Sequence, residues 1–153
     1  MITTVKTNSQ NPDFINLVKL LDAELAKRDG EDHAFYSQYN HIDRLNHVVV
    51  LYSNYLPVAC GAIKEFESKK TEIKRMYTFP EYRGRGLATT VLIALEEWAA
   101  DLGYDFTVLE TGKRQPEAIA LYKKNGYIRR SNYGQYDGIE NSVCFEKRLD
   151  KKP

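Results

Sequence analysis

The chain has 153 residues, of which 42% are hydrophobic and 28% are charged, so a disordered chain is excluded. This length fits one domain, residues 1–153, and is enough to bury a core without disulfides or metals. With 22 basic against 21 acidic residues the net charge is only +1, which argues against binding to nucleic acid or to an anionic membrane.

The cysteines and histidines indicate neither a metal site nor a redox pair. Cys60 and Cys144 are far apart, and neither has a sequence neighbour that would lower its thiol pKa for an acyl-enzyme. The histidines match no familiar metal spacing, so we expect no metal: they are His33, His41 and His47. With no apolar signal region in residues 1–10 and no apolar stretch near 20 residues, we expect a soluble, cytoplasmic protein.

The first third of the chain predicts a strand and then a helix. Residues 2–7 can form a short strand. Asn11 is a suitable N-cap, Pro12 suits the first helical turn, and Gly30 ends the segment. The apolar residues between them recur with helical spacing: they are Phe14, Leu17, Val18, Leu21 and Leu25.

The next segments predict three antiparallel strands in a meander. The expected strands are 48–52, 57–67 and 71–79, with turns at Ser53-Asn54 and Lys69-Lys70. Residues 31–46 carry no clear pattern.

The second half of the chain alternates helices with strands. A helix is expected from residue 87 to 102, ended by Gly103, with Glu96 and Glu97 off its apolar face. That face carries Leu87, Val91, Leu95, Trp98 and Leu102. A strand at 106–110, a helix at 116–124 and two C-terminal strands, the last at 142–149, complete an α/β mixed-sheet domain with helices on both faces.

The run Arg83-Gly84-Arg85-Gly86 joins an expected strand to an expected helix. Glycines let the backbone approach a bulky anion, and the free N–H groups of a first helical turn attract one. The Gly-Lys-Ser/Thr ending of a Walker loop and the third glycine of a dinucleotide fingerprint are both missing. The run therefore predicts a phosphate or pyrophosphate site, and a tight strand–helix turn is the alternative.

This loop and a second motif that follows it in the chain resemble the GNAT superfamily of acyl-CoA N-acetyltransferases. The family's pyrophosphate motif, Gln or Arg, two residues, Gly, one residue, Gly or Ala, is met by Arg83, Gly86 and Ala88. About thirty residues later, Glu117–Tyr127 is similar to the family's Ala-x-x-Leu-Tyr-x-x-x-Gly-Phe/Tyr helix. The resemblance is strongest over residues 71–128 and implies a GNAT fold: a mostly antiparallel mixed sheet with one splayed strand pair.

The resemblance also implies a cofactor, acetyl-CoA as co-substrate, and its binding residues. The strand before the loop would hold the pantetheine arm, at Met76, Tyr77 and Thr78. The family usually has Asn where this chain has Gln115, a further candidate for that arm. The loop would hold the pyrophosphate through the N–H groups of Gly84, Arg85, Gly86, Leu87, Ala88 and Thr89.

Acetyl transfer to an amine needs a base, because the attacking amine must be neutral, and an acid for the departing thiolate. The resemblance implies that Tyr122 is the acid, where a core aromatic is the alternative. Glu72 has the spacing of a glutamate base in the histone-acetylating branch of the family, and a surface ion pair with Lys74 is the alternative. Glu110 is a second candidate for the base or for binding a cationic acceptor.

The acceptor site is expected in two variable regions: residues 33–39, with His33 and Tyr36, and 133–137, with Tyr133. Packing is the alternative role for their aromatic residues. The function expected from these features is direct acetyl transfer to a primary amine of a small molecule or peptide. A non-catalytic acyl-CoA sensor or interaction module, and a nucleotide-phosphate binder, are the rival hypotheses. A homodimer through the C-terminal strands stays open.

Overall fold

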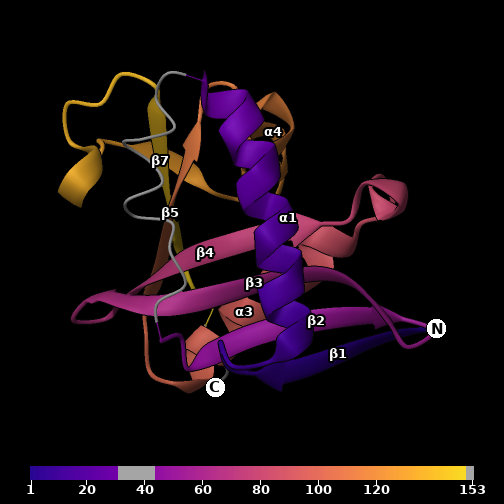
Figure 1. The fold of residues 1–153 in the computed structure, drawn as a ribbon. Coiled ribbons are helices and arrows are strands. Elements are labelled where there is room, and N and C mark those ends of the chain that lie inside the picture. Colours follow the sequence, from indigo (N-terminus) through magenta and orange to yellow (C-terminus); the bar gives the residue numbers. More distant parts are fainter. Residues whose placement is uncertain (31–43, 151–153) are drawn as a thin grey trace. The chain divides into compact units, whose positions relative to one another are not determined.

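A computed structural model describes residues 1–30 and 44–150 of the chain (Figure 1). The chain divides into two compact units, one of Met1–Lys64 with Ile73–Leu95 and one of Glu65–Glu72 with Glu96–Pro153. Each unit is described by itself below. The elements are β1 (Ile2–Thr7), α1 (Pro12–Asp29), β2 (His47–Ser53), β3 (Leu56–Glu67), β4 (Lys70–Thr78), η2 (Pro80–Tyr82), α3 (Leu87–Asp101), β5 (Phe106–Gly112), α4 (Pro116–Lys124), β6 (Ile128–Arg130), η3 (Gly134–Tyr136) and β7 (Ser142–Arg148).

The strands follow the order β1-β2-β3-β4-β5-β7-β6. In the first unit, β1 pairs antiparallel with β2 from Ile2↔Ser53 to Thr7↔Val48, and β2 pairs antiparallel with β3. The register of β2 shifts between Leu51 and Tyr52, at its end near the turn. The antiparallel β2–β3 pairing confirms the first half of the predicted meander, and the strand order places β4 beside β3.

Helix α1 lies across one face of the first unit's strands (Figure 1). Its start is fixed by the Asn11 side chain, whose Oδ1 accepts hydrogen bonds from Asp13 N at 2.9 Å and Phe14 N at 3.1 Å. The predicted apolar stripe packs on the sheet and removes a continuous apolar surface from water. The buried cluster consists of Phe14, Leu17, Val18, Leu21, Leu45, Val48, Val50, Cys60, Ala62 and Tyr77.

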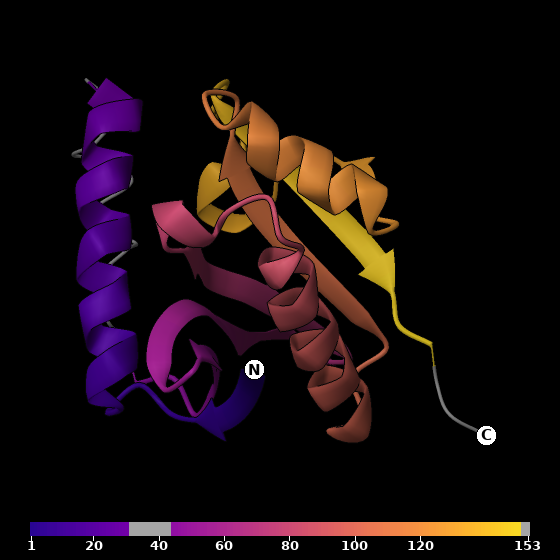
Figure 2. The same cartoon turned by 90° about the vertical axis from the view of Figure 1, so that its right-hand side faces the viewer.

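The first turns of α3 cover the opposite face of the same strands (Figure 2). A Cβ placed on Gly61 of β3 would lie 2.5 Å from Met76 Sδ and 2.9 Å from Val91 Cγ1 and Leu95 Cδ1. Glycine at this position therefore lets the helix approach the sheet closely.

The second unit is built on β5, which pairs antiparallel with β7 from Phe106↔Arg148 to Gly112↔Ser142, while β7 pairs with β6. The parallel pairing of β4 with β5 covers Lys70–Glu72 against Phe106–Val108 and makes the sheet mixed, as predicted. Helix α4 packs through the Tyr122 ring, 6.3 Å from the Phe145 ring of β7.

Two features of the predicted helix at 87–102 are wrong. Glu96 is buried rather than off the apolar face, because Tyr127 Oη and Lys147 Nζ donate to its carboxylate at 2.8 and 2.9 Å. Leu102 is 45% exposed, because the helix ends at Asp101 and Gly103 turns away with φ +96°. The remaining predicted elements are present with ends shifted by one or two residues. In the described residues, no helix is long and apolar enough to cross a membrane.

Gly61→Ala should lower the free energy of unfolding by roughly 1–3 kcal/mol, because the added methyl group overlaps Val91 and Leu95 in a packed layer. Urea unfolding followed by tryptophan fluorescence measures the change. Glu67→Ala, an exposed substitution on β3, is the control and should change stability by less than about 0.5 kcal/mol. Equal stabilities for Gly61→Ala and the unaltered protein would contradict the close approach.

Candidate functional site

The loop between β4 and α3 is shaped by two glycines in the left-handed region. Gly84 has φ +81° and Gly86 has φ +77°, conformations that cost other residues about 1 kcal/mol or more. The turn Pro80–Tyr82 precedes them, anchored by Phe79 N donating to Val58 O at 2.8 Å. These glycines turn the chain from the strand into the helix within a few residues.

The hydrogen-bond ladder of α3 begins directly after the second loop glycine. The first helical hydrogen bond runs from Thr90 N to Gly86 O at 3.1 Å, so the N–H groups of Leu87, Ala88 and Thr89 precede the helical ladder. The helix dipole adds partial positive charge at the same end. This geometry suits an anion such as a pyrophosphate.

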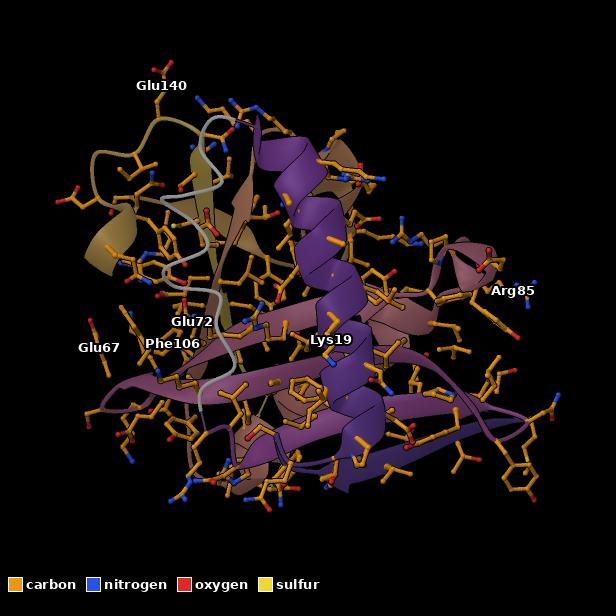
Figure 3. The ribbon with its side chains drawn as sticks, viewed as in Figure 1. Lys19, Glu67, Glu72, Arg85, Phe106 and Glu140 are labelled. Carbon is orange, nitrogen blue, oxygen red and sulfur yellow. The ribbon has the colours of Figure 1, made fainter. Side chains whose placement is uncertain are left out.

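The two arginines of the loop differ in their contacts. Arg83 Nε donates to Thr78 O and its Nη2 to Glu24 Oε1, both at 2.8 Å, so this side chain ties the loop to β4 and α1. Arg85 lies 4.9 Å from the centre of the Tyr82 ring, is exposed, and projects away from the loop (Figure 3). Arg83 therefore anchors the loop through two hydrogen bonds, whereas the Arg85 guanidinium stacks on Tyr82 at the surface.

The three residues predicted on the end of β4 have different surroundings. Met76 is half-buried near Gly61, Tyr77 is buried in the α1 core, and Thr78 lends its carbonyl to Arg83. This end of β4 and the loop therefore form one connected piece of the first unit.

In the second unit, Tyr122 projects from α4 among aromatic rings. Its ring lies 5.7 Å from that of Tyr127 in an edge-on arrangement, and the residue is 6% exposed. Burial, and then the charge of Glu110, raises the pKa of Tyr122, so its hydroxyl stays protonated at neutral pH. Glu110 itself lies on β5 opposite Cys144.

Glu72 and Tyr133 are joined by a hydrogen bond that the sequence did not predict. Tyr133 Oη donates to Glu72 Oε2 at 2.6 Å, across 61 positions of sequence. Glu72 is only 8% exposed, so its carboxylate is buried when Tyr133 donates to it. Burial and the Glu72 carboxylate raise the pKa of Tyr133 well above its usual range, which keeps the hydroxyl a donor.

Tyr136 completes this group of side chains. Its ring meets the Tyr133 ring edge-on at 5.8 Å, and the pKa of Tyr136 is raised by burial and by the charges of Glu110 and Glu72. Two carboxylates and three buried tyrosines, Tyr122, Tyr133 and Tyr136, therefore influence one another electrostatically in this unit.

Both cysteines are buried. Burial raises the pKa of Cys60 to about 12 and that of Cys144 to about 11, so little thiolate forms at neutral pH.

Of the other predicted site residues, Gln115 lies in the described part of the chain and two do not. Gln115 stands at the N-cap of α4, where its backbone N donates to Gly112 O at 3.0 Å while its side chain makes no capping hydrogen bond. His33 and Tyr36 lie outside the described residues. Within residues 1–30 and 44–150, no group of three or more His, Cys, Asp or Glu side chains could hold a metal ion.

Comparison with known proteins identifies the family of the chain. The sequence model of the acetyltransferase (GNAT) family matches residues 14–127. The chain belongs to the GNAT acetyltransferase family. The match includes the loop, the start of α3 and all of α4, so both motifs found in the sequence belong to that family's pattern.

The relatives of this GNAT chain are themselves acetyltransferases by name. It is 38% identical over 93 residues to an IAA acetyltransferase of Azospirillum brasilense, over 60% of this chain and 61% of that one. It is 35% identical over 92 residues to YsnE, an uncharacterized N-acetyltransferase of Bacillus subtilis, over 59% and 61% of the two chains. The matched region thus spans about three fifths of these relatives.

Solved structures match over nearly the whole chain. A candidate acyl-CoA N-acyltransferase from Klebsiella pneumoniae superposes with a TM-score of 0.82 and 32% identity, covering 98% of this chain and 99% of that one. The PaiA N-acetyltransferase of Thermoplasma acidophilum, solved with coenzyme A, gives a TM-score of 0.71 at 18% identity over 97% and 99% of the chains, a likeness of fold. The predicted GNAT fold is therefore confirmed.

Tyr133→Phe should lower the free energy of unfolding by roughly 1.5–3 kcal/mol at pH 7, because the buried Glu72 carboxylate loses a donor. The unfolded chain has a tyrosine pKa near 10 and the folded pKa is higher, so the hydroxyl's contribution is complete below pH 10 and is lost above it. The stability gap between the two proteins should narrow by up to about 1.4 kcal/mol per pH unit between pH 10 and 11.

Chemical unfolding at pH 7, 9, 10 and 11 measures this gap. Tyr55→Phe is the matched control, since Tyr55 is 91% exposed and its substitution should leave stability unchanged at every pH. A gap that is absent at pH 7, or constant up to pH 11, would show that the Tyr133–Glu72 hydrogen bond does not stabilise the folded protein.

Proposed function

We propose that this chain is a single-domain N-acetyltransferase that moves the acetyl group of acetyl-CoA directly to a primary amine of a small molecule or peptide. The observation that carries the proposal is the loop at Arg83–Gly86, where two left-handed glycines lead directly into the first turn of α3 within a GNAT sequence motif. The backbone N–H groups of such a turn can bind the pyrophosphate of acetyl-CoA without any metal.

The cofactor would be held by three elements of the chain. The N–H groups from Gly84 to Thr89 would receive the pyrophosphate, and the exposed Arg85 would add charge. The end of β4, at Met76, Tyr77 and Thr78, would bind the pantetheine arm, with Gln115 as a further polar contact. Arg83 has a positioning role in this proposal, because its donors already hold Thr78 and Glu24.

The attacking amine must first lose a proton. A free lysine-like amine has a pKa of about 10.4, so a carboxylate or a water chain has to accept that proton. We assign this role to Glu72, which Tyr133 holds in place at 2.6 Å, and retain Glu110 as the second candidate. As the amine nitrogen forms its bond to the acetyl carbon, a backbone N–H near Met76 or Tyr77 would stabilise the oxyanion.

The departing sulfur then needs a hydrogen-bond donor. As the carbon–sulfur bond breaks, the electron pair stays on sulfur, and Tyr122 would donate its hydroxyl proton to it. The raised pKa of Tyr122 keeps the hydroxyl protonated, and the phenolate left behind would be reprotonated from solvent or from the base. The acceptor itself would contact Glu110 and Tyr133, together with His33 and Tyr36 of the segment outside the described residues.

Tyr122→Phe should reduce kcat by roughly 100-fold or more while leaving the KM for acetyl-CoA within about twofold, because it removes a proton donor and keeps the buried ring. The assay is release of free CoA thiol from acetyl-CoA with a panel of small amines and peptides. Tyr104→Phe, which removes a hydroxyl bonded to Glu65 at the surface, is the control and should retain the full rate.

The outcomes of that assay separate the hypotheses. Thiol release with an amine, lost in Tyr122→Phe, supports both the transferase and the acid. Full activity in Tyr122→Phe would contradict the acid assignment alone. Tight CoA binding with no turnover on any amine would favour the sensor or interaction module, and an absence of CoA binding would overturn the proposal.

Arg85→Ala should raise the KM for acetyl-CoA about 5- to 20-fold, with a smaller change in kcat, because a charge-assisted contact to phosphate is lost. The loss should shrink as salt is increased from 0.05 to 0.5 M, since Arg85 is exposed and its charge is screened. Arg148→Ala, another exposed arginine, is the control. An unchanged KM at low salt would remove Arg85 from the cofactor site.

A further inference from the structure

Arg75 on β4 is an arginine in an unusual position. Its side chain is only 4% exposed, and its backbone φ is +61°, in the left-handed region. That conformation costs a residue with a Cβ about 1–2 kcal/mol. Left-handed residues within strands occur at bulges, which re-aim a side chain and are frequent beside active sites.

The guanidinium of Arg75 is only half satisfied. Its Nη1 donates to Asp22 Oδ1 of α1 at 2.9 Å. Its Nη2 is fully buried and has no hydrogen-bond partner within the described part of the chain. Because a guanidinium carries its donors in a fixed fork, a single bond to Asp22 leaves the N–H groups of Nη2 unpaired.

An unpaired, buried donor on a charged group is costly, so a partner for Nη2 would stabilise this site. The partner must accept hydrogen bonds and tolerate a cation, which selects an anionic oxygen. Asp22 already neutralises one charge, so a singly charged carboxylate adds less repulsion than a doubly charged phosphate. The partly exposed Asp22 carboxylate bonds Nη1, so the acceptor oxygen that Nη2 lacks has to come from a further group.

We propose that Arg75 binds a carboxylate of the acceptor, so that the substrate is an amine that also carries a carboxylate group, such as an amino acid or a peptide C-terminus. This inference rests on the proposed transferase function, which gives the pantetheine arm to the three residues that directly follow Arg75. A carboxylate bound at Arg75 would orient the acceptor at the strand that receives the thioester.

The experiment compares matched acceptors on the full-length protein. L-amino acids and short peptides with a free C-terminus are each assayed beside their C-terminal amides, by release of CoA thiol. The best acceptor should prefer the acid over the amide by roughly 10- to 100-fold in kcat/KM, the worth of a charge-assisted hydrogen bond. Most of the lower kcat/KM of the amide should come from a higher KM rather than from a lower kcat.

The variant Arg75→Lys keeps a cation near Asp22 but loses the second nitrogen of the fork. It should reduce the acid-to-amide ratio to near one, and Arg148→Lys, a substitution at an exposed arginine, should keep the original ratio. Thermal unfolding checks that both variants are folded, and the acceptor comparison in the unaltered protein holds even if Arg75→Lys does not fold.

The results distinguish this inference from the proposed function. CoA binding with equal turnover of acids and amides, or with turnover of no carboxylate-bearing amine in the panel, would overturn the carboxylate site and leave CoA binding intact. An acid preference that survives in Arg75→Lys would also overturn it. Failure to bind CoA would overturn the transferase proposal on which the inference rests.

Discussion

The first unit depends on the way Arg83 fastens the loop between β4 and α3. The two left-handed glycines allow the chain to turn, but they also leave it free to adopt other conformations. The bonds from Arg83 to the Thr78 carbonyl and the Glu24 carboxylate remove that freedom, because they tie the loop to a strand and to a helix at once. The N–H groups at the start of α3 are thereby held in one direction before any ligand binds. Such preorganisation lowers the entropy that a bound anion would otherwise cost.

The second unit has a different physical character, set by buried phenols and carboxylates. Tyr133 donates to Glu72, and Tyr127 donates to Glu96, each within 2.8 Å. In both pairs the low dielectric strengthens the bond and raises the tyrosine pKa, so the phenols remain donors over the physiological range. The Tyr127 pair is structural, because Lys147 and Thr107 complete its network. The Tyr133 pair belongs to the group near Glu110 and Tyr136, which is where we place the acceptor chemistry.

Local sequence signals were sufficient for the elements and for the loop, because each signal acts over a few residues. Asn11 caps α1 through hydrogen bonds from the residues two and three positions later in the chain. The turn at Gly86 depends only on the backbone φ of that one residue. The burial of Glu96 and the bond between Glu72 and Tyr133 were not predictable in this way. Each depends on a partner 31 or 61 residues away, whose position is set by strand pairing rather than by local spacing. The same applies to Arg83, where the motif identified an arginine but its partner Glu24 lies on α1.

Arg83 and Arg75 differ in whether the nitrogens of their guanidinium groups have hydrogen-bond partners, and this difference suggests a structural role for Arg83 and a binding role for Arg75. Arg83 is partly exposed, yet two of its nitrogens have oxygen partners, and water can reach the rest. Arg75 is more deeply buried, so water cannot supply the partner that Nη2 lacks. Desolvation of the guanidinium and a left-handed backbone are two separate costs at this one residue, and an apolar Met would avoid the first of them but not the second. A ligand carboxylate that binds Arg75 would offset the first cost during turnover, and this balance favours a recognition role for Arg75 over a purely structural one.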